Sequence, residues 1–131
     1  TIKNIDVESK YYKRKFRLIN FLNKKVVYKN IQIKISKLND YIKKNNIEKI
    51  DFLKIDTEGY EFEVLLGLEN KIQLVDIIMF EHHYDNMIKK GYTFTDINRL
   101  LTKNHFKKIY KSRMPFRKTF EYIYERKELA N

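Results

Sequence analysis

The residues whose side chains are best suited to catalysis or binding lie in one short stretch, KIDTEGYE, which runs from Lys54 to Glu61. It places Asp56 and Glu58 directly after an apolar run, in a chain whose 28 Lys and Arg outnumber its 17 Asp and Glu. A carboxylate at the end of a buried strand is unfavourable unless it has partners or a function. We therefore expect Asp56, and with it Glu58, to take part in the function of the protein.

A second group of ionisable residues, Glu81, His82 and His83, ends another apolar run. If the two runs are neighbouring parallel strands, ~4.8 Å apart, their carboxyl ends meet at one edge of the sheet, where open α/β sheets bind ligands. The sequence therefore predicts that Asp56 and Glu58 lie near this second group. Successive strand residues point to opposite faces, so both histidines serve one site only if the strand has already ended.

Other polar residues nearby have simpler explanations. Glu61 and Glu63 fall in the first turns of an expected helix, where negative charge interacts favourably with the helix dipole, and we expect both to be solvated. Lys54 is expected either to extend its ammonium group into solvent or to pair with one of the acids. Gly59 suits a tight turn between strand and helix.

Asp56, Glu81 and His83 also allow an alternative function, a metal-dependent hydrolase, because carboxylates and imidazoles are common metal ligands. Their spacing matches no standard ligand motif, and we expect no metal. The chain has no cysteine, which excludes a disulfide framework, a thiolate zinc site and a cysteine nucleophile.

Strands and helices alternate over most of the chain. We expect strands at residues 31–35, 50–56, 75–83, 107–113 and 119–126, and helices at 36–46, 60–72 and 93–106. The residues expected to face the core are Leu38, Tyr41 and Ile42 on the first helix, Phe62, Leu65 and Leu66 on the second, and Ile97, Leu100 and Leu101 on the third.

Three local patterns refine this prediction. Alternation at 31–35 indicates a half-buried strand, the apolar run at 50–56 indicates a strand covered on both faces, and Ser36 is an expected helix cap. The last two strands are too close for a helix between them, so they should form an antiparallel hairpin. The order predicts an α/β fold with a mostly parallel sheet and a reversed C-terminal hairpin, which class I methyltransferases show and in which other α/β folds can also end.

Size and charge limit the function further. The 131 residues suffice for one domain, and 43% hydrophobic residues with ten Tyr and nine Phe are typical of a globular protein. No apolar run approaches the ~20 residues that cross a bilayer, so we expect a soluble, cytoplasmic protein. The net charge of +11 comes mostly from scattered Lys, and we do not expect nucleic acid as a partner. A second alternative is a non-catalytic basic binding module that uses the basic, aromatic segment Lys10–Arg17.

The stretch Ile50–Glu69, IDFLKIDTEGYEFEVLLGLE, closely resembles the hallmark of FkbM-type methyltransferases, a strand running into K-I-D-x-E-G-x-E and a helix with L-x-G. Residues Lys34–Ile42 are similar to the family's preceding T-L-D-x-h segment, where h is apolar, with Ser36 and Asn39 as departures. Residues Asp76–His83 resemble the next strand of the family, which commonly ends in an acid and a histidine.

The resemblance covers about residues 31–84, with compatible elements to 126. It implies a methyltransferase domain over residues 31–126, with an uncertain N-terminal segment at 1–30 and a tail at 127–131. In the family, S-adenosylmethionine (SAM) lies mainly on a D-x-G-x-N-x-G loop after the first strand and on an acid after the second, and neither is present here. The chain therefore resembles the C-terminal half only, a partial Rossmann-like sheet with most of the SAM site outside it.

The resemblance also implies methylation of a hydroxyl oxygen on a sugar, polyketide or similar small molecule, which is the expected partner. Such a transfer needs a base for the hydroxyl proton. Asp56 is our preferred base or acceptor-orienting carboxylate, and His83 is the competing base. Glu58, Glu81 and Lys54 are expected to position the acceptor.

In the complete fold, strand 50–56 is interior. Without its first neighbour, one edge of this apolar strand is unpaired, which favours aggregation. Either residues 1–30 cover the edge, or the chain depends on a further half.

Overall fold

The computed structural model describes residues 6–21, 31–85, 88–115 and 118–127. Residues 1–5 and 22–30 of the expected N-terminal segment, and 128–131 of the expected tail, lie outside this range. The helices are α1 (Lys10–Phe21), α2 (Leu38–Lys44), α3 (Glu61–Leu66) and α4 (Phe94–Lys103), with a 3₁₀ helix, η1 (Glu69–Leu74). The strands are β1 (Ile50–Ile55), β2 (Val75–His83), β3 (Phe106–Arg113) and β4 (Thr119–Arg126).

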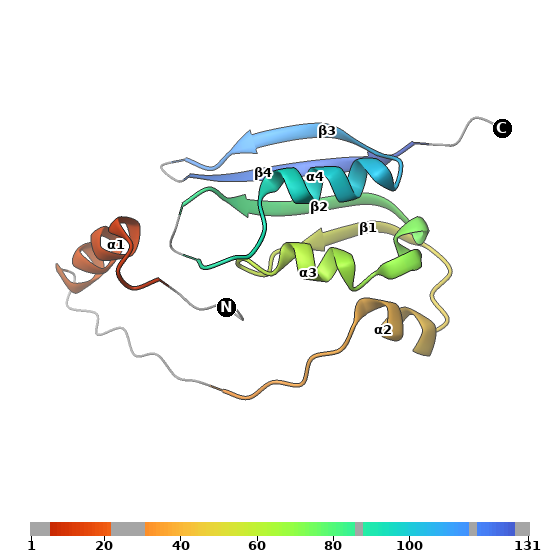
Figure 1. Ribbon diagram of the computed structural model, residues 1–131, viewed down its shortest axis with the longest axis horizontal. Helices are drawn as coiled ribbons and strands as arrows, with labels where there is room; N and C mark the ends of the chain where they lie inside the picture. The colour runs from red at the N-terminus through yellow and green to blue at the C-terminus, as the bar shows by residue number, and fades with distance from the viewer. Residues whose placement is uncertain (1–5, 22–30, 86–87, 116–117, 128–131) are drawn as a thin grey trace.

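The described strands form one sheet in the order β1-β2-β4-β3 (Figure 1). β1 and β2 are parallel, whereas β4 runs antiparallel to both β2 and β3. The α/β class and the C-terminal hairpin are thus confirmed, but the mostly parallel sheet is not, because only one of these three strand pairs is parallel. The reason is topological: β4 returns to lie between β2 and β3, so the hairpin contributes both antiparallel pairs.

Helices α3 and α4 cover one face of the sheet (Figure 1). The core lies between these helices and the sheet. Here Phe80 and Tyr122 stack with ring centroids 5.4 Å apart, and Ile97 and Leu101 of α4 are fully buried. Each such large apolar side chain stabilises the fold by roughly 1.5–3 kcal/mol. α4 begins at a capping box, in which Thr93 and Asp96 satisfy each other's backbone N–H groups.

Strand β1 differs from its prediction. Phe52 is 51% exposed and Lys54 is exposed, because no described element packs over this face of the strand. β1 is also an edge strand, paired only with β2 among the described residues. The expected free edge is therefore present in the described part of the chain, but the expected cover on both faces is wrong.

The segment before α2 is also not as expected. Residues 31–37 form no strand, and Ile31, Ile33 and Ile35 are 57–70% exposed, because alternation makes a strand only where a partner strand satisfies the backbone. The α2 N-cap is Lys37, without a side-chain cap, so the role given to Ser36 is wrong. Upstream, the described part of the uncertain N-terminal segment contains α1, which lies beyond the carboxyl ends of β1 and β2 (Figure 1).

The helix expected at 60–72 is two elements, α3 and η1, which meet near Glu69, whose φ of 52° interrupts the helix. Most predicted core positions are buried or half-buried, including Ile42 and Leu65. Tyr41 and Leu66 are exceptions, 55% and 49% exposed, because the short helices turn them away from the sheet.

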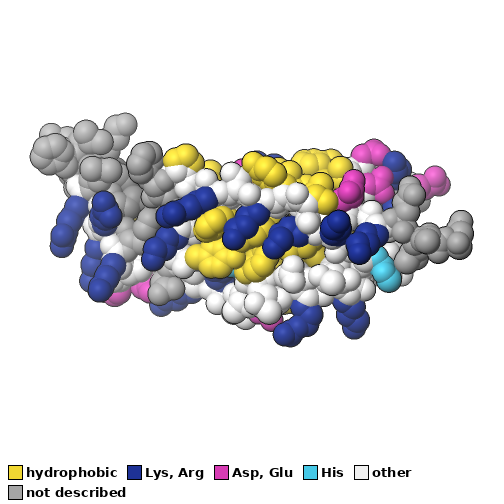
Figure 2. Space-filling model, turned by 90° about the horizontal axis from the view of Figure 1, so that it is seen from above, with side chains coloured by type: hydrophobic (Ala, Val, Ile, Leu, Met, Phe, Trp, Pro, Cys, Tyr) yellow, Lys and Arg dark blue, Asp and Glu magenta, His cyan; other side chains and the backbone are white. Residues whose placement is uncertain are grey.

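Part of the positive charge lies along β3. In the view from the β3 side, hydrophobic side chains gather in the middle of the molecule with Lys and Arg among them (Figure 2). Lys108 Nζ lies 5.5 Å from the Phe94 ring centroid, and Lys111 Nζ lies 4.7 Å from that of Phe120. These cations cover aromatic surface beside an edge strand, a placement that opposes edge-to-edge association. Along the described part of the chain, no helix combines the length and the apolar composition needed to cross a membrane.

Candidate active site

The turn that leaves β1 is built on an unusual backbone. Glu58 and Gly59 both have positive φ, 53° and 99°. Glycine adopts this region readily, but a glutamate there is strained by about 1–3 kcal/mol, and such strain gathers at functional sites. The strained position turns the Glu58 side chain toward the end of β2.

The buried side chain of Glu61 stabilises this turn through hydrogen bonds. Its side chain is 1% exposed and accepts hydrogen bonds from Gly59 N at 2.8 Å, from Thr57 Oγ1 at 3.2 Å and from the Tyr92 hydroxyl. Burial, followed by the hydrogen bond to this carboxylate, raises the pKa of Tyr92. The prediction that Glu61 is solvated is wrong, because the turn folds back over it and the loop before α4 closes the other side. Glu63 is half-buried rather than fully solvated.

His83 is the centre of the group at the end of β2. Its side chain is only 6% exposed, and its Nε2 lies 3.3 Å from Glu58 Oε2 and 3.5 Å from Glu81 Oε2. Nε2 is buried and closes no hydrogen bond within the described residues. The structure thus brings together Glu58, Glu81 and His83 at one edge of the sheet, as the convergence of the two strand ends predicts.

The other ring nitrogen of His83, Nδ1, contacts a side chain of β4. Nδ1 lies 3.0 Å from Thr119 Oγ1, and Asp85 Oδ2 is 3.9 Å away on the same side. His83 and Thr119 are partners in the β2–β4 register, and Thr119 is 1% exposed. The sequence analysis missed Thr119, since nothing in a single sequence reveals that β4 lies beside β2.

Asp56 and Lys54 lie on the solvent-exposed side of the site, at the carboxyl end of β1. Lys54 Nζ donates to Asp56 Oδ2 at 3.3 Å, and their side chains are 54% and 44% exposed. The expected pairing of Lys54 with an acid is confirmed. Burial raises the pKa of Glu81, the Asp56 charge adds to the rise, and His83 acts in the opposite direction. Asp56 is therefore within electrostatic reach of Glu81.

His82 points to the other face of the sheet, as the strand period requires. It is 3% exposed, and its ring lies 4.7 Å from that of Tyr84 and 5.9 Å from that of Phe94. Burial lowers the pKa of His82 to about 4, so it is neutral near pH 7. Its Nδ1 has no hydrogen-bond partner among the described residues.

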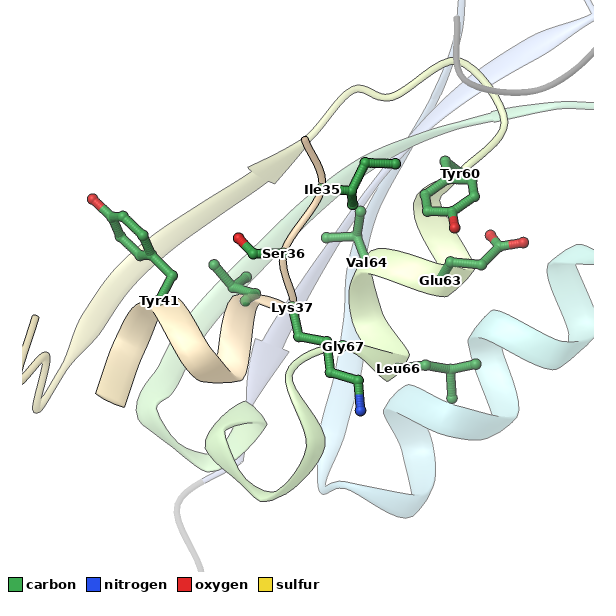
Figure 3. A pocket seen from close by; sticks show the side chains of 10 residues that line it. Ile35, Ser36, Lys37, Tyr41, Tyr60, Glu63, Val64, Leu66 and Gly67 are labelled. Carbon is green, nitrogen blue, oxygen red and sulfur yellow. The ribbon is translucent and has the colours of Figure 1, made fainter. Parts of the chain in front are cut away.

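Two concave regions lie near these elements. The larger, with a volume of ≈ 810 Å³, runs between α3 and the segment that enters α2, and is lined mainly by apolar groups such as Ile35, Val64 and Leu66 (Figure 3). Its cation Lys37 is already paired with Glu69 at 2.8 Å. The smaller, ≈ 550 Å³, is lined by both adjacent histidines, whereas Glu58 and Glu81 are not among its described lining residues.

Two further features bear on whether the site holds a metal or SAM. In the described ranges, no three His, Asp or Glu side chains are arranged to hold a metal ion. The three glycines of the sequence are eight or more residues apart, and only Gly59 has a positive φ in the described structure. These residues do not form a glycine-rich cofactor loop.

Comparisons with known proteins give one match. A family model described as "Methyltransferase FkbM domain" matches residues 5–108. The match begins upstream of residue 31, where the resemblance in the sequence begins, and it includes both strand ends of the site. No curated protein and no solved structure matches the chain.

Proposed function

The chain belongs to the FkbM methyltransferase family, and we propose that it forms the acceptor side of an enzyme that methylates a hydroxyl oxygen of a small molecule, with SAM as the methyl donor. When bound, SAM would supply a methyl carbon attached to a positively charged sulfur. The restriction to the C-terminal half of the domain, and the boundaries at residues 30 and 126, stay predictions.

One observation carries the proposal: a buried imidazole nitrogen, His83 Nε2, lies between two carboxylates at the edge where the strand ends meet. A hydroxyl is a poor nucleophile until its proton leaves, and a positioned base contributes about 10²–10⁴-fold to such a step. In the proposed step, His83 Nε2 would take the proton of the acceptor hydroxyl as its O–H bond breaks, which would free the oxygen to receive the methyl group that bound SAM would supply, with the electrons of the S–C bond left on the donor.

The surroundings of His83 suit a base. Nε2 accepts a proton only if Nδ1 carries the other hydrogen, and Thr119 Oγ1, at 3.0 Å from Nδ1, can accept that hydrogen. Once Nε2 is protonated, the carboxylates of Glu58 and Glu81 stabilise the imidazolium. This is the orienting and stabilising role that a third group plays beside a catalytic histidine.

Asp56, the base that we preferred from the sequence, is less suited to this role. Its carboxylate is 44% exposed and paired with Lys54, so water and an ammonium group already satisfy it. We therefore assign proton removal to His83. Asp56, Glu58, Glu81 and Lys54 then position the acceptor and set the electrostatic field around it.

The test is methyl transfer by the protein as its gene encodes it. The enzyme is incubated with S-adenosyl-[methyl-³H]methionine and a panel of methyl glycosides, phenols and macrolactones, and labelled products are identified by mass spectrometry. The proposal requires label on a hydroxyl oxygen of at least one acceptor. Label on nitrogen or carbon only, or no transfer while the protein is folded, would contradict it.

A further inference from the structure

The outer edge of β3 is a surface that the proposed function does not use. Among the described strands, β3 pairs only with β4, so the backbone N–H and C=O groups along its other side face no described strand. Residues 107–111 are all exposed, whereas a strand packed on one face alternates between buried and exposed positions. In the described structure β3 is therefore open along its edge, and a strand of another molecule can pair with it.

One face of this edge carries a row of cations. Lys108, Lys111 and Arg113 each lie opposite an aromatic residue of β4 in the β3–β4 register. Directly opposite residues of paired strands share a face of the sheet, so these three side chains point to the face that α3 and α4 cover in part. All three are exposed, and the view of this side shows Lys and Arg among hydrophobic side chains (Figure 2). The edge therefore presents positive charge along the direction of the strand.

The aromatic rings beside these cations are already in contact with them. Lys108 Nζ lies 5.5 Å from the ring centroid of Phe94, Lys111 Nζ lies 4.7 Å from that of Phe120, and both ammonium groups lie 5.9 Å from that of Tyr122. Single-stranded nucleic acid needs free aromatic faces on which its bases stack, and these three rings do not provide them. Neither lysine forms an ion pair with an acid of the described residues. Their charge is therefore available to an acid of a partner.

The same charge decides which kind of strand pairs with the edge. Two copies of the chain joined along β3 bring like charges together, which is unfavourable, whereas acids at the facing positions form favourable cross-strand pairs. The bulge between Lys108 and Tyr110 interrupts the ladder, so the regular stretch that a partner can follow is 110–113. Alternate residues of that partner face Lys111 and Arg113.

We propose that β3 binds an acidic, extended peptide segment of another protein, which adds to the sheet as a further strand and places acids at alternate positions opposite Lys111 and Arg113. In this mode, backbone hydrogen bonds give affinity, and the paired charges give specificity. The inference does not depend on methyl transfer, because β4 separates β3 from β2, the strand that carries His83.

The test measures binding to the protein as its gene encodes it, by fluorescence anisotropy at low salt. The first probe is a labelled peptide of five Thr-Glu repeats. The second is a peptide of five Pro-Glu repeats, which has the same charge and spacing of acids but cannot pair regularly, because proline does not donate to a ladder. The third is a ten-nucleotide oligothymidylate. We expect the Thr-Glu peptide to bind most tightly of the three.

A pair of double variants tests the cations themselves. Lys111→Gln/Arg113→Gln removes two charges from the edge, and the control Lys43→Gln/Lys44→Gln removes two charges from exposed positions of α2. We expect the first to raise the Kd of the Thr-Glu peptide by about fivefold, the combined effect of two opposite-charge pairs, and the control to change it by less than about twofold. The melting temperature of each variant verifies that it is folded.

Hydrogen exchange followed by NMR tests the mode of binding. We expect backbone amides within residues 110–113 that point away from β4 to exchange more slowly when the Thr-Glu peptide is bound. Slower exchange along β1 instead would contradict the inference, because β1 is the other edge of the described sheet.

The inference is overturned if the Pro-Glu peptide binds as tightly as the Thr-Glu peptide, because charge alone then explains binding. It is also overturned if the oligothymidylate binds more tightly than either peptide, if no probe binds the folded protein, or if Lys111→Gln/Arg113→Gln keeps the affinity of the wild type. None of these results bears on the labelled-methyl assay, so the two proposals fail or stand separately.

Discussion

The ends of β1 and β2 are neighbours in one sheet, yet the ionisable side chains at the two ends differ strongly in solvent exposure. At the end of β1, the side chains of Asp56 and Glu58 are 44% and 50% exposed, whereas at the end of β2 those of Glu81 and His83 are 14% and 6% exposed. The cause is position: β1 is an edge strand of the described sheet, and β2 lies between β1 and β4. This difference is why we propose proton transfer at the buried end and a mainly electrostatic role for the exposed end.

The largest expected effect comes from the centre of the buried end. His83→Asn keeps a polar side chain of similar reach but cannot act as a base near neutral pH. We expect kcat for methyl transfer to fall by about 10²–10⁴-fold, with little change in SAM affinity. Steady-state kinetics on the acceptor found in the labelled-methyl assay measures this. A kcat within threefold of wild type would remove His83 from the mechanism.

The next largest effect is on stability and compares two acids of the same turn. Glu61→Ala leaves the buried donors of Gly59, Thr57 and Tyr92 without their acceptor, and each such donor costs about 1–3 kcal/mol. We expect the free energy of unfolding, measured by urea titration, to fall by about 3 kcal/mol. The control Glu58→Gln, at a half-exposed site, should change it by less than about 0.5 kcal/mol. Equal losses in the two variants would contradict the separation of buried and exposed acids.

A smaller effect is expected at the exposed end. Asp56→Asn removes a charge that water and Lys54 already balance, so kcat should fall by less than about tenfold, which corresponds to ~1.4 kcal/mol of transition-state free energy. Unfolding free energy should hardly change, because exposed ion pairs contribute about 0–1 kcal/mol. A loss of kcat as large as that of His83→Asn would restore Asp56 as the base.

The smallest effect is a pH dependence at the buried end. The raised pKa of Glu81 means that the folded protein holds this proton more tightly than the unfolded chain. The contribution of Glu81 to stability therefore falls as pH rises from the ordinary carboxyl pKa through its raised value in the folded state. Glu81→Gln lacks this titration, so urea titrations between about pH 4 and pH 7 should show the variant gaining on wild type as pH rises. Parallel pH curves would show that Glu81 is not perturbed by its burial.

The sequence predicted the elements that depend on local patterns better than the features that depend on distant parts of the chain. β2, α4 and the β3–β4 hairpin were predicted with nearly correct bounds, because the periodicity of their sequences is a local signal. The strand at 31–35 was wrong because an alternating pattern does not provide a partner strand. The two-sided cover of β1 was wrong because a run of apolar residues does not reveal which elements pack over it.

The site was predictable in part for the same reason. Glu58, Glu81 and His83 could be brought together from one rule about the ends of parallel strands. Thr119 could not, since its contact with His83 joins residues 36 positions apart through the β2–β4 register. Glu61 and Glu63 have the same local signal, two acids in the first turn of α3, and only the folded loop around Tyr92 separates the buried one from the other.

The base itself can be tested by chemical rescue. His83→Ala removes the imidazole from a nearly closed site. Added imidazole can occupy that space and take up the proton of the hydroxyl that is methylated. The account predicts that turnover of His83→Ala rises with imidazole concentration and saturates, while Asp56→Ala does not respond. A folded His83→Ala protein that stays inactive at every imidazole concentration, or an Asp56→Ala protein that is rescued by formate instead, would contradict it.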